Sequence, residues 1–155
     1  MSTDIESVPA VGTAMPDIDL VGPDGLATTL QQVRAGQRAV VYFLRAATCP
    51  VCVNHARTLT DLATTGDLGN NVRVVLVAPG EPLDAAELAR RIGNDTVGSW
   101  ASGSGHEAAG LGSFLALQHS GTFLVNADGT VAYRRTATLP PNSFSRRELL
   151  KALGR

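Results

Sequence analysis

The sequence predicts an α/β fold in which helices flank a central mixed β-sheet that carries an N-terminal β-hairpin. Strand-like and helix-like segments alternate along the chain, and turn signals separate pairs of apolar runs near each end. In addition, the only two cysteines stand three apart where a strand-like run meets a helix-like one. The length of 155 residues suits one domain, which we expect over residues 12–155 after a flexible N-terminus at 1–11.

The N-terminal hairpin is predicted from two short apolar runs, residues 18–20 and 26–28. Between them lies a Gly-Pro-Asp-Gly sequence at residues 22–25, and its proline at the second position and glycine at the fourth suit a type I turn. Residues 29–34 are then expected to form a short helix that Gly36 closes.

Two strands are expected at the centre of the sheet. Residues 39–44 form an apolar, β-branched run, and a helix-compatible segment follows the cysteines from residue 53 to about residue 63. Residues 71–78 form a second buried-looking strand. Together with the next helix, these segments predict a strand-helix-strand-helix core.

Capping-box patterns open two further helices. One begins at residues 84–87 and runs to about Ile92, and it places Leu83, Leu88 and Ile92 on roughly one face. The other opens at residues 145–148, close to the C-terminus. We expect both helices to pack against the sheet.

The segment between these helices contains a loop and a second hairpin. Residues 96–105 are rich in glycine and serine around Trp100, and their lack of a clear period predicts a loop before a short helix at 107–111. Residues 122–125 and 130–133 read as strands joined by an Asn-Ala-Asp-Gly turn. The sheet therefore ends in an antiparallel pair.

The composition excludes several classes of protein. A hydrophobic content of 44% argues against disorder, and a formal net charge of -1 provides no basic stripe for nucleic acid. Residues 1–11 are polar and acidic, unlike a secretory signal, and no run of about 18 apolar residues could span a membrane. We therefore expect a cytoplasmic protein with neither a nucleic-acid nor a membrane partner.

The chemistry is expected at Cys49-Pro50-Val51-Cys52. Cys49 falls near the N-cap of the predicted helix and Pro50 at its first position, where the missing N–H costs nothing. The free amides and the positive end of the helix dipole favour a thiolate, so at least one sulfur becomes a nucleophile near neutral pH. The spacing also lets the two sulfurs close a short disulfide. Redox chemistry is the leading hypothesis.

Two other interpretations of the cysteines remain open. The pair could be buried thiols that act only as small apolar side chains. Alternatively, Cys49, Cys52 and His55 could bind zinc, with His106 or His119 as a fourth ligand. No second cysteine pair completes a familiar zinc spacing, so we expect no metal and no cofactor.

A mixed sheet with a cysteine pair after its first core strand has the arrangement of the thioredoxin fold. Three segments make the chain similar to the peroxiredoxin-like branch of that superfamily, the alkyl hydroperoxide reductase and thiol-specific antioxidant group, in its CxxC-bearing type. They are residues 12–20 (GTAMPDIDL), 45–52 (RAATCPVC) and 121–131 (GTFLVNADGTV). The resemblance covers the chain from about residue 12 to its end.

The resemblance leaves open which cysteine reacts first. In a peroxiredoxin-like mapping Cys52 is the peroxide-reacting sulfur, and Arg45 and Cys49 stand where the family usually has proline and threonine. In a thioredoxin-like mapping Cys49 is the exposed attacking thiol and Cys52 is the buried resolving thiol. Ser120 stands where many peroxiredoxins have arginine and thioredoxins have a cis-proline.

Three residues near the cysteines are candidates for stabilising a thiolate or a peroxide: Arg45, Thr48 and His55. A cation such as Arg45 is unusual at the end of a buried strand unless it serves a site, although it could also form a salt bridge. His55 lies one turn beyond Cys52 and could shift its pKa, or it could be an ordinary half-exposed helix residue.

Four more residues are candidates for lining a substrate groove: Trp100, Ser120, Gly121 and Thr122. Trp100 lies in the predicted loop, where it could line the groove or pack as a core aromatic. The residues from 120 to 122 enter the late strand, and the resemblance implies that they face the cysteines.

These features predict a thiol-dependent redox enzyme that reduces peroxides or disulfides. One cysteine attacks the O–O or S–S bond, the other resolves the product as a Cys49–Cys52 disulfide, and a thioredoxin-type or low-molecular-weight thiol restores the dithiol. A thioredoxin- or glutaredoxin-like oxidoreductase without peroxidase activity is one alternative. A non-catalytic module that senses redox state or binds a partner is the other.

Overall fold

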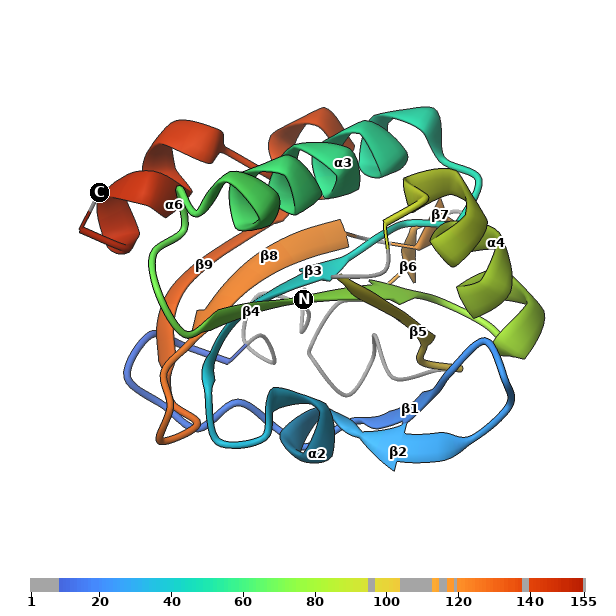
Figure 1. The fold of residues 1–155 in the computed structure, drawn as a ribbon, viewed down its shortest axis with the longest axis horizontal. Helices are drawn as coiled ribbons and strands as arrows, with labels where there is room; N and C mark the ends of the chain where they lie inside the picture. Colours follow the sequence, from blue (N-terminus) through green and yellow to red (C-terminus); the bar gives the residue numbers. More distant parts are fainter. Residues whose placement is uncertain are drawn as a thin grey trace.

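The computed structural model describes residues 9–94, 97–103, 113–114, 117–118, 120–137 and 140–154. Seven strands form one mixed sheet in the order β2-β1-β5-β4-β3-β8-β9 (Figure 1). The strands of this sheet are β1 Asp19–Val21, β2 Ala27–Thr29, β3 Arg38–Phe43, β4 Val72–Ala78, β5 Gly98–Ala101, β8 Ser120–Val125 and β9 Val131–Ala137. A separate pair is formed by β6 Ser113–Phe114 and β7 Leu117–Gln118.

Helices cover both faces of the sheet. They are α2 Leu30–Arg34, α3 Pro50–Thr65, α4 Pro82–Ile92 and α6 Arg146–Ala152, with a 3-10 turn η1 at Pro140–Asn142. Helices α3 and α6 lie on one face and α2 on the other (Figure 1). None of the helices in the described ranges is long and apolar enough to cross a membrane.

The sheet separates two hydrophobic clusters, and β3 contributes to both. Its even-numbered residues Val40 and Tyr42 pack in the cluster that contains both cysteines and the buried faces of α3, α4 and α6. Its odd-numbered residues Val41 and Phe43 pack in the opposite cluster, beneath β1 and α2. This alternation follows from the two-residue period of a strand, and it directs the Tyr42 side chain toward the cysteine helix.

The pairing of the strands confirms the predicted mixed sheet. Strand β3 runs parallel to β4 and antiparallel to β8, and β8 pairs with β9 as a hairpin. The N-terminal hairpin is also present, and the Gly25 N–H donates to the Gly22 carbonyl at 3.0 Å to close its turn. The C-terminal helix begins as predicted, because the Ser145 hydroxyl accepts the Glu148 N–H.

Helix α4 begins three residues earlier than the sequence predicts. Its N-cap is Glu81, whose side chain and that of Asp84 form the capping box, so Asp84 is the third helical residue. The predicted shared face is wrong for Leu83, which is 84% exposed while Leu88 is fully buried. Leu83 is the second residue of the helix, five positions before Leu88, so the two side chains point to different sides of the helix.

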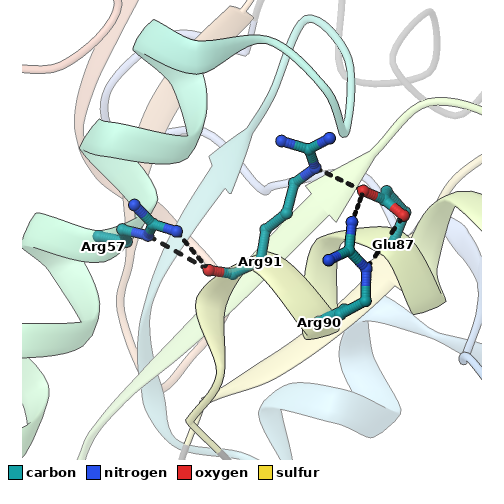
Figure 2. A network of polar contacts seen from close by, with 4 residues as sticks. All are labelled: Arg57, Glu87, Arg90 and Arg91. Atoms are coloured by element: carbon teal, nitrogen blue, oxygen red, sulfur yellow. Dashed lines mark hydrogen bonds and ion pairs between the residues drawn. The ribbon is translucent and has the colours of Figure 1, made fainter.

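Helices α3 and α4 are joined by arginine side chains at the C-terminal end of α4 (Figure 2). The Arg57 guanidinium donates from Nε and Nη2 to the Arg91 carbonyl oxygen at 3.2 and 2.8 Å. Glu87 forms ion pairs with Arg90 and Arg91. A cation at this position complements the carbonyls that the end of a helix leaves unpaired, so the network fixes α4 against the cysteine helix.

The predicted loop at residues 96–105 is wrong in part, because residues 98–101 form strand β5, which runs parallel to β4. Gly98 and Ser99 disfavour a strand by propensity. Glycine nevertheless fits position 98, because a Cβ there would collide with the Trp100 indole. The glycine therefore makes room for a neighbouring side chain on the same face. The helix predicted at 107–111 lies outside the described residues.

The end of α2 also differs from the prediction. Its C-cap is Ala35, which adopts a left-handed conformation with φ 53°, and Gly36 follows with φ 72°. Two successive residues with positive φ turn the chain sharply into β3.

Candidate active site

The two cysteines occupy the first turn of α3, as the sequence predicts. Cys49 is the N-cap, with extended backbone, and Pro50 is the first helical residue. The Cys49 Sγ accepts a hydrogen bond from the Cys52 N–H at 3.4 Å, so the sulfur acts as the capping group. The positive end of the helix dipole lies at this sulfur.

Both thiols are buried. Cys49 is 4% exposed and Cys52 is fully buried, so the expectation of an exposed Cys49 is wrong. Thr48 and Pro50 are exposed on either side of Cys49, and Val51 is 38% exposed. The N-terminal turn therefore has an exposed rim around two buried sulfurs.

Cys52 is a neutral thiol near pH 7. Burial raises its pKa to about 12, and a hydrogen bond to Cys49, in which the Cys52 thiol is the donor, acts in the same direction. The Arg45 N–H donates to the Cys52 Sγ at 3.4 Å and partly offsets this increase in pKa, as does a hydrogen bond from the Tyr42 hydroxyl. The first turn thus holds a protonated Cys52 beside a Cys49 sulfur that accepts hydrogen bonds.

Tyr42 and Ser143 belong to this site although sequence reasoning missed both. The Tyr42 hydroxyl lies 3.1 Å from the Ser143 Oγ, and both residues are fully buried. Tyr42 could have been found from the alternation of β3, which places it on the face of the cysteine helix. Ser143 carries no comparable local signal, because it lies 101 positions away in the sequence.

The three residues predicted to stabilise a thiolate have different surroundings. His55 is half-buried, and its ring packs against those of Tyr42 and Phe144 at centroid distances of 6.1 and 5.2 Å. The Arg45 side chain is half-buried, and its Nε has no hydrogen-bond partner among the described residues. Thr48 is exposed. Arg45 and Thr48 thus border the cysteines, whereas His55 contributes to an aromatic cluster behind them.

The four residues predicted to line a groove lie in two separate places in the sheet. Trp100 packs against the cluster on the opposite face of the sheet from the cysteines. Ser120, Gly121 and Thr122 are buried in β8 beside β3, and the Thr122 hydroxyl donates to the Ser143 carbonyl at 2.7 Å. Strand β8 therefore contacts the segment around Ser143 from within the sheet.

The described part of the chain shows no metal cluster at the cysteines. A pocket of about 410 Å³ is lined by residues including Gln37, Val72 and Val97 and lies at the opposite end of β3 from the cysteines. No group of three or more histidine, cysteine, aspartate or glutamate side chains within the described ranges could hold a metal ion. Two of the predicted zinc ligands, His106 and His119, lie outside those ranges.

Mild oxidation is expected to form an intramolecular Cys49–Cys52 disulfide, because both cysteines belong to one helical turn and the Cys49 Sγ already accepts the Cys52 N–H. The intact mass should fall by about 2 Da, since two thiols lose two hydrogens. The Cys52→Ser variant is the control and should not show this loss. A disulfide-linked dimer of the wild-type protein would contradict the prediction.

Comparison with known proteins supports a redox role for this site. The Redoxin family model matches residues 10–153. A search of curated proteins found no match. Among solved structures, the chain is similar to a peroxiredoxin-like protein from Aquifex aeolicus, with 14% identity and a TM-score of 0.77 over 95% of this chain and 87% of that one.

Two further solved structures share the fold. Peroxidoxin BcpB from Mycobacterium tuberculosis is 18% identical, with a TM-score of 0.75 over 94% of this chain and 97% of that one. A thiol peroxidase from Chromobacterium violaceum is 15% identical, with a TM-score of 0.74 over 95% and 87%. The fold, the cysteine pair at the helix N-terminus and the family match over nearly the whole chain lead to one conclusion: the chain belongs to the Redoxin family and is a thiol-dependent oxidoreductase.

Proposed function

We propose that the enzyme reduces small peroxides, with Cys49 as the attacking sulfur and Cys52 as the resolving sulfur. The observation that carries this proposal is the unequal environment of the two cysteines. The Cys49 Sγ accepts the Cys52 N–H at the helix N-terminus, whereas burial raises the pKa of Cys52 to about 12. A thiolate is the reactive form, so the environment favours attack by Cys49.

The reaction balances with these two residues. The Cys49 thiolate attacks one peroxide oxygen, the O–O bond breaks, and the departing alkoxide or hydroxide takes up a proton, which leaves a sulfenic acid on Cys49. Cys52 then attacks the Cys49 sulfur, hydroxide leaves, and this hydroxide takes up the Cys52 proton as water. The product is the Cys49–Cys52 disulfide. The Arg45 Nε is available to stabilise the departing oxygen.

A thiol reductant completes the cycle. We propose a thioredoxin-type dithiol or a low-molecular-weight thiol, which transfers two electrons to the disulfide and restores both thiols. The same proposal places the enzyme in the cytoplasm, where such reductants keep dithiols reduced.

Peroxide is favoured over protein disulfides by the exposure of the attacking sulfur. Cys49 is 4% exposed, which favours a molecule as small as a peroxide over a bulky disulfide. Exchange with a protein disulfide requires an accessible thiolate. The similarity of the fold to a peroxidoxin and to a thiol peroxidase points in the same direction.

The proposal is tested by comparing hydrogen peroxide with a protein disulfide such as insulin under the same thiol reductant. We expect the second-order rate constant for peroxide to exceed that for insulin, because the low exposure of Cys49 favours the smaller molecule. Faster reduction of insulin would overturn the choice of substrate. If neither compound is turned over, the protein is a redox-sensing module and the catalytic proposal is wrong.

A further inference from the structure

One buried hydroxyl on β8 has no hydrogen-bond partner. Ser120 is fully buried, and its Oγ bonds to no group within the described part of the chain. Thr122, two positions further along the strand, is equally buried, but its hydroxyl donates to the Ser143 carbonyl at 2.7 Å. A buried hydroxyl that has given up water without gaining a protein partner is unfavourable, so Ser120 calls for a functional explanation.

The register of β8 places Ser120 at the cysteine end of the sheet. The last pair between β3 and β8 is Phe43 with Gly121. Because these strands are antiparallel, Ser120 lies beside Leu44, and neighbouring strands are about 4.8 Å apart. Leu44 and Leu124 both belong to the hydrophobic cluster that contains the two cysteines. Side chains alternate along a strand, so Ser120, like Leu124, is directed to the face of the cysteine helix.

A second buried donor without a partner follows Leu44 in the chain. The Arg45 N–H donates to the Cys52 Sγ at 3.4 Å, which fixes this segment to the first turn of α3. The Arg45 Nε is buried, and none of the described residues accepts a hydrogen bond from it. Strand β8 and the end of β3 therefore each bring one unpartnered donor to the end of the sheet where the cysteine turn is bonded.

A peroxide matches these two donors. A hydroxyl and a guanidinium N–H both donate hydrogen bonds, and the peroxide oxygen that leaves gains negative charge as the O–O bond breaks. Neither Ser120 nor the Arg45 Nε has to give up a partner among the residues that the structure covers. A hydrogen bond to a charged oxygen is stronger than one to a neutral oxygen, so both donors favour the transition state over the bound peroxide.

We propose that Ser120 binds the substrate: its hydroxyl donates to the leaving oxygen of the peroxide, beside the Arg45 Nε. This inference rests on the proposed function in taking a peroxide as the substrate. The Cys49 sulfur gives two electrons to the peroxide, the S–O bond forms and the O–O bond breaks. The departing oxygen takes up a proton from the solvent, which leaves water or an alcohol and a sulfenic acid on Cys49. Ser120 keeps its own proton throughout.

The first test follows the oxidation of Cys49 by one equivalent of hydrogen peroxide in the Cys52→Ser background, where the reaction stops at the sulfenate. Adding Ser120→Ala should lower the second-order rate constant about ten- to a hundredfold, as expected when one donor to a charged oxygen is lost. Alkylation of Cys49 by iodoacetamide should keep its rate, because no oxygen leaves in that reaction. Equal slowing of both reactions would mean that Ser120 acts on the sulfur or on the fold, and would overturn the proposal.

The matched control is Thr122→Val, which removes a buried hydroxyl that does have a partner from the same strand and face. It should lower the urea midpoint of unfolding and keep the rate of Cys49 oxidation. Ser120→Ala should keep or raise the midpoint, because it removes a buried polar group without a partner. A lower midpoint for Ser120→Ala would show that the hydroxyl serves the fold, and would overturn its role in binding peroxide.

The parent variant separates this inference from the proposed function. If peroxide oxidises Cys49 in the Cys52→Ser parent and Ser120→Ala leaves the rate unchanged, the role of Ser120 is wrong and the peroxidase proposal stands. If the parent is not oxidised by peroxide, the proposed function fails and the role of Ser120 fails with it.

Discussion

Replacing Cys49 with serine is expected to lower peroxide turnover by more than about a thousandfold, the scale seen when a catalytic nucleophile is removed. Replacing Cys52 is expected to leave the first oxidation intact, because Cys49 keeps its place as the N-cap of α3. The Cys52→Ser enzyme should therefore consume one equivalent of peroxide and stop as a sulfenate, which the missing resolving thiol cannot convert to a disulfide.

The measurement is peroxide consumption per enzyme molecule, together with trapping of the sulfenate by a dimedone-type reagent. Cys52→Ser should bind one equivalent of the trap, and Cys49→Ser should bind none. The reverse pattern, with Cys52 trapped and Cys49 dispensable for the first oxidation, would contradict the assignment. It would instead support the mapping in which Cys52 is the peroxide-reacting sulfur.

The second large effect concerns stability and depends on the two faces of α4. Leu88 is fully buried in the cluster that contains the cysteines, so Leu88→Ala is expected to lower the free energy of unfolding by about 2–5 kcal/mol. Leu83 in the same helix is 84% exposed. Leu83→Ala should change the stability by less than about 0.5 kcal/mol, as is usual for surface positions.

Urea unfolding followed by circular dichroism measures both variants, and Leu83→Ala serves as the matched control because the chemical change is identical. The loss at Leu88 combines the transfer of a buried side chain with the cavity that remains. Equal losses at the two positions would mean that Leu83 is buried in solution and that the orientation of α4 differs from the one described. The difference between the variants thus measures which face of the helix packs against the sheet.

Local patterns in the sequence were sufficient for much of this structure. The hairpins, the strands β3 and β4 and the N-cap position of Cys49 follow from turn residues, apolar runs and capping chemistry within a few positions of one another. The cysteine pair and its place at the start of a helix were visible in eight consecutive residues, 45–52. These features depend on interactions between near neighbours, which is why a single sequence reveals them.

Other features depended on contacts between distant segments. Strand β5 is poor in strand-forming residues, and its pairing with β4 and with Val21 of β1 supplies the hydrogen bonds that its propensity does not. The same pairing sends the Trp100 side chain to the face opposite the cysteines. A one-residue change of register would reverse that face, and propensity alone does not set the register.

The sequence by itself determined the redox pair and its place at the N-terminus of a helix, because capping is a local interaction. Only the tertiary structure decided how the two sulfurs differ. Burial of Cys52 raises its pKa, and Tyr42 and Ser143, which are 101 positions apart, meet beside it. Desolvation and long-range hydrogen bonds depend on which segments pack together, and that packing exists only in the folded chain.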